Sequence, residues 1–119
     1  MTNDTTDTQT IVTAKKSADL NDWARQAMGV ACRLVITQGI AALPQEDQSA
    51  IRQKVERFDA FSRGNDPYGE HDFGAFDHKG EKIFWKIDCY DNTMTKGSED
   101  PTNPLLTLRV LTIMLASEY

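Results

Sequence analysis

Apolar side chains near the start of the chain recur at the spacing of one helix face: Leu20, Trp23, Ala24, Ala27 and Met28. This spacing predicts a helix over residues 17–28 that turns these side chains toward a core. Gly29 suits the end of such a helix, because glycine adopts the left-handed conformation without strain. Residues 1–16 are rich in Thr and Asp and carry no such pattern, so we expect a disordered N-terminal tail.

The next segments carry strand and helix signals in turn. Residues 30–37 alternate β-branched and other side chains and predict a strand, while Pro44 and the apolar spacing after it predict a helix over about 44–57. A short strand is expected over 58–62, followed by a long polar loop over 63–72. We expect that loop to be ordered only where its side chains bond to its own backbone.

A hairpin is predicted in the middle of the chain. Strands over 73–77 and 81–91 flank His78-Lys79-Gly80, a glycine-containing connection that is typical of hairpins. Four alternate side chains of the second strand are expected to face the core: Ile83, Trp85, Ile87 and Cys89.

The last element is expected to be a helix over about 103–115. Asn103 can cap it, Pro104 can occupy its first turn, and the residues that follow are apolar on nearly every face. Such a helix is normally buried, so we expect it at the structural centre. The order α-β-α-β-β-β-α predicts a single α+β domain over 17–119, with three helices packed on a mostly antiparallel sheet of three to four strands.

Composition agrees with one soluble domain. The chain has 119 residues, of which 39% are hydrophobic and 26% charged, as in ordinary globular proteins. Its longest nearly apolar run, residues 105–116, is far shorter than the ~20 residues that cross a bilayer. The N-terminus lacks the features of a secretory signal. We therefore expect a cytoplasmic protein that does not bind membrane.

Charge is distributed unevenly along the chain. Residues 1–64 hold eight acids and eight bases, residues 101–119 hold one of each, and residues 65–100 hold nine acids and four bases, which accounts for the net charge of −5. A protein that binds nucleic acid through its phosphates needs a basic face, and only a modest one is present on the helix predicted at 44–57. Direct binding of DNA or RNA is therefore not expected.

The densest group of candidate catalytic side chains lies in the predicted loop. Glu70, His71 and Asp72 are consecutive there, and Asp88 stands in the neighbouring strand. Such groups could hold a divalent metal or act as an acid–base pair, which makes a metal-dependent hydrolase or nuclease-like enzyme one interpretation. The spacing fits no specific metal motif, and carboxylates also cap turns, so we expect no metal and no cofactor.

An interaction surface is the other interpretation of residues 65–100. An acidic face can imitate the phosphates of nucleic acid and occupy a basic groove on a partner protein, although many acidic faces are merely solvated. The candidate partner-binding residues are Asp66, Tyr68, Glu70, Asp88, Asp91, Glu99 and Asp100. The two cysteines, Cys32 and Cys89, lie in apolar runs without a second ligand nearby and are expected to be buried free thiols.

Three sequence blocks stand out in addition to Leu20-Asn21-Asp22: residues 65–74 (NDPYGEHDFG), 85–91 (WKIDCYD) and 109–119 (RVLTIMLASEY). In this order they closely resemble an uncharacterised bacterial family, domain of unknown function 3768, and the resemblance covers about residues 17–119. It transfers no activity to any position. Members of that family look like small accessory proteins of alphaproteobacterial chromosomes and plasmids, often near antirestriction-type genes.

These observations lead to one main hypothesis and two alternatives. The main hypothesis is a non-enzymatic interaction protein of mobile genetic elements, in its narrowest form an anti-CRISPR or antirestriction inhibitor of a nucleic-acid-targeting defence system, acting through its acidic surface. The first alternative is the metal-dependent hydrolase. The second is a regulatory module that binds another protein through an apolar surface.

Overall fold

The computed structural model describes residues 4–119 and the side chains of residues 8–119. Its elements, in chain order, are α1 (Asp4–Gln26), β1 (Arg33–Ile36), α2 (Gln38–Ala41), α3 (Gln45–Glu56), β2 (Phe73–His78), β3 (Glu81–Tyr90), β4 (Leu108–Leu115) and the 3-10 helix η1 (Ala116–Glu118).

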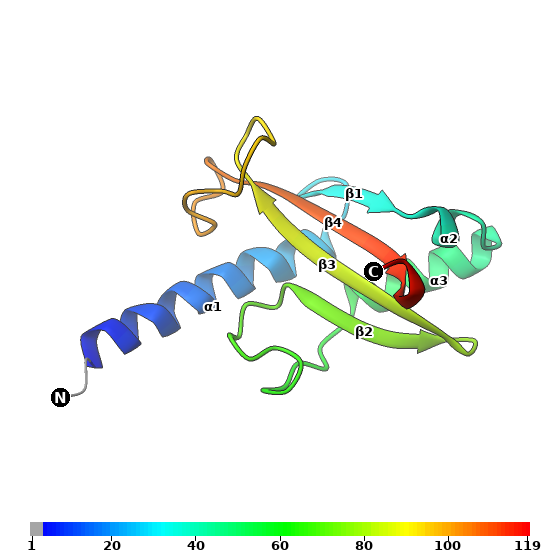
Figure 1. Cartoon of the computed structure of the whole chain (residues 1–119), viewed down its shortest axis with the longest axis horizontal. Helices are drawn as coiled ribbons and strands as arrows, with labels where there is room; N and C mark the ends of the chain where they lie inside the picture. Colours follow the sequence, from blue (N-terminus) through cyan, green and yellow to red (C-terminus); the bar gives the residue numbers. More distant parts are fainter. Residues whose placement is uncertain (1–3) are drawn as a thin grey trace.

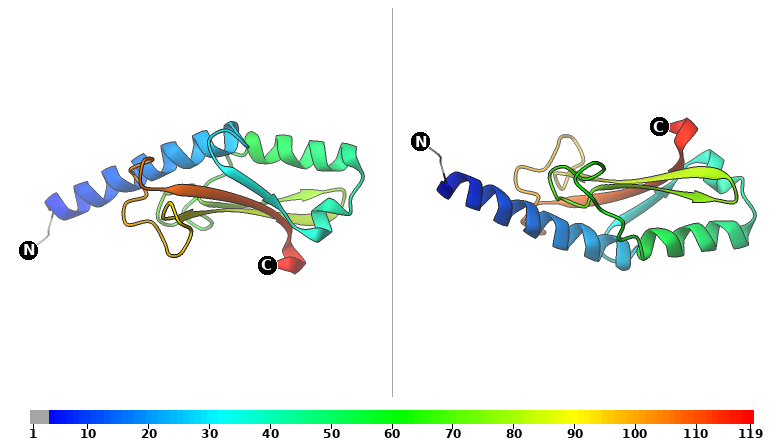
Figure 2. Two further views of the ribbon diagram at one scale, coloured as in Figure 1. Left: turned by 90° about the horizontal axis from the view of Figure 1, so that it is seen from above. Right: turned by 90° about the horizontal axis from the view of Figure 1, so that it is seen from below.

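The four strands form one mixed sheet in the order β1-β4-β3-β2. The β2–β3 and β3–β4 pairs are antiparallel, whereas β1 runs parallel to β4. Figure 1 shows the sheet from its broad side, and Figure 2 shows that α1 and α3 cover one face while η1 lies toward the other. The predicted α+β class is therefore confirmed, with three helices and a mostly antiparallel four-stranded sheet.

The helix predicted over 103–115 is wrong, because residues 108–115 form β4. This strand lies between β1 and β3 and is buried on both faces. Leu111 and Ile113 are fully buried on the helix-covered face, and Val110 and Met114 are nearly so on the other. A strand buried on both faces has a continuous apolar sequence, which cannot be distinguished from a buried helix by periodicity.

The first helix also differs from the prediction. α1 begins at Asp4 rather than near residue 17, so residues 4–16 of the expected tail are helical, and residues 1–3 lie outside the described part. Trp23, which we expected in the core, is 53% exposed. The buried face of α1 is instead largely polar and carries Ser17, Asn21 and Arg25 beside Ala24.

The remaining differences concern short segments. Residues 58–62 do not form the predicted strand, since Phe58 and Phe61 turn inward and pack edge-on against Trp85. β1 is shorter than the predicted strand over 30–37, and α2 was not predicted. The hairpin is confirmed, with a two-residue turn in which Lys79 and Gly80 both have positive φ, as in type I′ turns.

The core lies between the sheet and the two covering helices. Trp85 and Ile83 of β3 pack with Ile51 and Val55 of α3 and are fully buried. Of the two free cysteines, Cys32 is buried and Cys89 is partly buried. In the part of the chain that the structure describes, no helix has both the length and the apolar character needed to cross a bilayer.

Candidate functional site: the loop end of the sheet

Two long loops meet at one end of the sheet. Because β2 begins where β3 ends and β4 begins, residues 63–72 and 91–107 emerge at the same end, beside α1 (Figure 1). We call these two loops the loop end. Seven of the nine acids of residues 65–100 lie in it or in the adjoining strand: Asp66, Glu70, Asp72, Asp88, Asp91, Glu99 and Asp100. The other two acids, Asp77 and Glu81, flank the hairpin turn at the opposite end.

The 63–72 loop is held by bonds to its own backbone. The Asp66 carboxylate accepts the backbone N–H groups of Glu70 and His71, at 3.2 and 3.3 Å from Oδ1. The Asn65 amide donates to the carbonyl of Ala60 and accepts the backbone N–H of Ser62. Asp66 therefore bonds to the backbone of its own loop, in the way we expected for an ordered loop, and has a structural role.

The same loop is fastened to α1. The Asn21 side chain donates to the Glu70 carbonyl at 2.9 Å, and Nδ1 of His71 lies 2.9 Å from Oδ1 of Asp22. The His71 ring stacks parallel to Phe61 with a centroid separation of 3.8 Å. His71 also has a φ of 56°, a conformation that a non-glycine residue keeps only where its surroundings fix it.

A buried arginine connects this network to α3. The Arg25 side chain is 2% exposed, and its guanidinium donates to Asp22 at 2.7 Å and to the carbonyls of Val55 and Phe58, both at 2.9 Å. Val55 lies in the last turn of α3, where carbonyls lack partners within the helix. Arg25 therefore caps α3 while its positive charge balances Asp22.

A second arginine fastens the other loop. Arg109 of β4 is nearly buried, and its guanidinium donates to Oδ1 of Asn21 at 2.7 Å and to the Pro101 carbonyl at 2.6 Å. Burial lowers the pKa of Arg109 and raises that of the Cys89 thiol beside it. Asn21 thus bridges Arg109 to the carbonyl of Glu70, so that one side chain of α1 holds both loops.

Two carboxyl groups at this end hold their protons more tightly than usual. Burial raises the pKa of Glu70, and the nearby carboxylates of Asp72 and Asp66 raise it further. Burial also raises the pKa of Asp72, with Asp66 and Asp88 adding to the effect. Both shifts come first from burial, and the neighbouring carboxylates add to them.

The structure gives the four residues proposed for catalysis different partners, although Asp72 lies near enough to His71 and Asp88 to be affected by their charges. His71 turns to Asp22 of α1, while Asp88 lies on the face of the sheet opposite the covering helices and pairs with Lys86 at 3.0 Å. Within the described residues, no three His, Cys, Asp or Glu side chains are grouped as metal ligands. This arrangement gives no support to a metal-dependent hydrolase built on Glu70, His71, Asp72 and Asp88.

Besides Glu70 and Asp88, described above, the other five of the seven proposed partner-binding residues divide into two groups. Asp91 and Asp100 bond to threonines of their own loop, so that these carboxylates, like Asp66, stabilise turns. Tyr68 and Glu99 instead extend into solvent, and Glu99 makes only a 3.5 Å contact with Lys96.

Sequence reasoning missed the buried polar residues that build this site. Asn21, Asp22 and Arg109 stand in the segments that resemble the family but carry no predicted role, and Arg25 carries none either. A signal was present: Arg109 interrupts a long apolar run, and a charge at such a position is buried only where it is paired.

Comparison with family models matches residues 36–118 to a family described as "Protein of unknown function (DUF3768)". This range runs from the end of β1 to η1 and includes both loops of the loop end. Comparisons with curated proteins and with solved structures gave no match.

Proposed function

This chain belongs to the DUF3768 family of proteins of unknown function, and from its geometry we propose that it is a non-enzymatic interaction protein that binds a partner protein through the loop end. The polar side chains there are used to fix two loops against α1 rather than being free for chemistry.

The exposed ring of Tyr68 is the observation that carries this proposal. Its side chain is 78% exposed, although Asp66 and α1 hold the backbone of its loop in place. An aromatic side chain kept in solvent by a fixed backbone loses little conformational entropy when it binds, and such residues are enriched among interface hot spots. Glu99, in the other loop at the same end, adds an exposed charge.

A narrower form of the proposal concerns the partner. Seven acids at this end favour a basic surface, and a groove that normally binds nucleic-acid phosphates is one such surface. We therefore propose a cytoplasmic protein of mobile elements that inhibits a nucleic-acid-targeting defence protein. The charge distribution and the position of the two loops support this form.

Affinity capture tests the proposal. Wild-type chain and a Tyr68→Ala/Glu99→Lys/Asp100→Lys variant would be immobilised and exposed to lysate of the source cell, with Asp77→Lys at the opposite end of the sheet as control. We expect a protein that the wild type and the control retain, that the triple variant loses, and that a 20-base-pair DNA duplex displaces. Retention that is equal on all three chains would refute the loop end as the binding surface.

A hollow between the end of α1, the segment after it and the 91–107 loop supports a second candidate, the regulatory module that binds through an apolar surface. Trp23, 53% exposed, and Val30, 87% exposed, line this hollow of about 240 Å³ together with Leu20 and Pro104. Exposed tryptophan is unusual and frequently contributes strongly to binding. If this candidate is correct, Trp23→Ala should abolish capture and the triple variant should not.

A further inference from the structure

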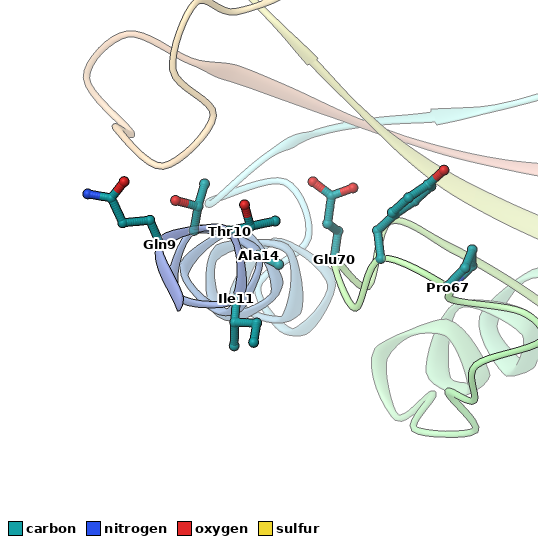
Figure 3. A pocket seen from close by; sticks show the side chains of 8 residues that line it. Gln9, Thr10, Ile11, Ala14, Pro67 and Glu70 are labelled. Atoms are coloured by element: carbon teal, nitrogen blue, oxygen red, sulfur yellow. The ribbon is translucent and has the colours of Figure 1, made fainter. Parts of the chain in front are cut away.

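A groove separates the N-terminal half of α1 from the tip of the 63–72 loop. It has a volume of about 630 Å³; Gln9, Thr13 and Ala14 line its helix side, and Pro67, Tyr68 and Glu70 line its loop side. Figure 3 looks along α1 and shows Glu70 between the helix and Pro67, whereas Ile11 points away from Glu70. The groove is open to solvent along one side and large enough for an amino-acid side chain.

Among the groove-lining residues whose side chains the structure describes, Glu70 is the only acid, and it is partly buried. The backbone N–H and carbonyl of Glu70 are bonded to Asp66 and Asn21. Among the residues that the structure describes, by contrast, no donor or cation is bonded to its carboxylate. Asp66 and Asp72 add negative potential nearby, so the groove attracts positive charge.

We propose that this groove binds an arginine side chain of the partner protein, with the guanidinium on the Glu70 carboxylate and its flat face against the ring of Tyr68. This inference rests on the proposed function and specifies the chemistry that the partner must supply.

Arginine fits this site for two reasons. Its planar guanidinium forms paired hydrogen bonds with a carboxylate and stacks on aromatic rings, and it is more weakly hydrated than the ammonium of lysine. The groove offers one carboxylate and one exposed ring on the same loop, two residues apart. The apolar part of an arginine side chain would contact Ala14 and Pro67, which line the same groove.

Titration of the isotope-labelled full chain with a blocked Gly-Arg-Gly peptide tests this inference by NMR. We expect shifts of the backbone amides of Glu70 and Ala14 that saturate with peptide. The same peptide with citrulline in place of arginine keeps the shape and lacks the charge, and it should give no saturable shift. Shifts that are equal for both peptides, or absent for both, would overturn the arginine site.

Three variants locate the binding, and two of them, Glu70→Gln and Glu99→Gln, each remove one negative charge. Glu70→Gln should weaken binding of the arginine peptide about fivefold or more, and Tyr68→Leu should weaken it roughly two- to fivefold. Glu99→Gln removes one charge from the other loop and should change binding less than twofold. Unchanged affinity of the Glu70→Gln variant would refute the inference. A captured partner that is lost by the loop-end triple variant but kept by Glu70→Gln would leave the proposed function standing while the arginine site fails.

Discussion

Single buried polar residues explain how α1 is attached to the rest of the molecule. Ordinarily the covering face of a helix is apolar, but α1 places Asn21 and Arg25 there and pairs most of their polar atoms. Asn21 bonds to the Glu70 carbonyl and to Arg109. The two terminal nitrogens of Arg25 bond to backbone carbonyls and Asp22, whereas its Nε has no partner among the described residues. A buried group of this kind is costly to leave unpaired, so its partners are fixed in position. This explains why a periodicity argument placed Trp23 in the core and missed Arg25.

Replacing Arg25 tests that attachment. Arg25→Met keeps an apolar chain of similar length but removes the guanidinium donor from the Phe58 carbonyl, from the Val55 carbonyl and from Asp22. The Val55 carbonyl then keeps only the Phe58 N–H at 3.3 Å, and Asp22 keeps its contact with His71. We expect a loss of about 3 kcal/mol in the free energy of unfolding, measured by urea denaturation. Lys15→Met on the exposed side of α1 should change it by less than about 0.5 kcal/mol. A loss below about 1 kcal/mol for Arg25→Met would contradict the assigned role.

Gly74 permits the close packing of Trp85 against β2. A Cβ atom at this position would collide with Nε1 of the fully buried indole, so Gly74→Ala should cost about 1–3 kcal/mol by overpacking. Gly64→Ala is a matched control, because its nearest neighbour would be the Ser62 hydroxyl at 3.8 Å. Thermal melts of the two variants should differ by several degrees, and equal melting temperatures would show that Trp85 can shift freely.

Glu118 ties the end of the chain to the segment before α2. Hydrogen bonds from the Thr37 hydroxyl and from the backbone N–H groups of Leu115 and Gly39 lower the pKa of Glu118 below its ordinary value of 4.5. Because the pKa of Glu118 is lower in the folded protein than in the unfolded one, its ionised carboxylate stabilises the fold at any pH above the unfolded-state pKa. This contribution is lost as the pH falls through the folded-state pKa. The Glu118→Gln variant should therefore have a lower melting temperature than wild type at pH 7, and this difference in melting temperature should disappear below about pH 4. A gap that is constant down to pH 3 would exclude this linkage.

At the scale of elements, the strands show what periodicity can and cannot establish. β3 alternates buried and partly exposed residues because only one of its faces is covered by helices, and its facing was predicted correctly. β4 is central and buried on both faces, so its sequence lacks alternation and resembles a buried helix. Its β-branched Val110, Thr112 and Ile113 were the available signal for a strand.

Three truncations distinguish the central strand from a helix. Leu111→Ala and Ile113→Ala should each lower the free energy of unfolding by about 2–5 kcal/mol, since both side chains are fully buried. Leu105 would belong to the core of a helix over 103–115, but in the structure it is 82% exposed. Leu105→Ala should therefore cost less than about 0.5 kcal/mol in denaturant melts. A cost comparable to that of Leu111→Ala would contradict the assignment of β4.

For the whole molecule, the α+β class, the hairpin, the 63–72 loop and the family could be predicted from the sequence, whereas the arrangement of the site could not. The site depends on contacts between α1, that loop and β4, which are up to 88 residues apart in the chain. Pairings such as Asn21 with Arg109 follow from the packing of the elements, and local pattern contains no information about them. The sequence also indicated that carboxylates of the acid-rich segment could stabilise turns, and the structure shows which ones do so: Asp66, Asp91 and Asp100.

The association rate with the captured partner tests most directly the claim that the loop end is the binding surface. It would be measured for wild type, Glu99→Lys/Asp100→Lys and the opposite-end control Asp77→Lys/Glu81→Lys, at low and physiological salt. We predict that charge reversal at the loop end slows association about tenfold at low salt, and that raising the salt concentration slows association of the wild type. The association rate of the opposite-end control should stay within about twofold of the wild-type rate. Rates that are insensitive to salt and equal for both double variants would contradict the account.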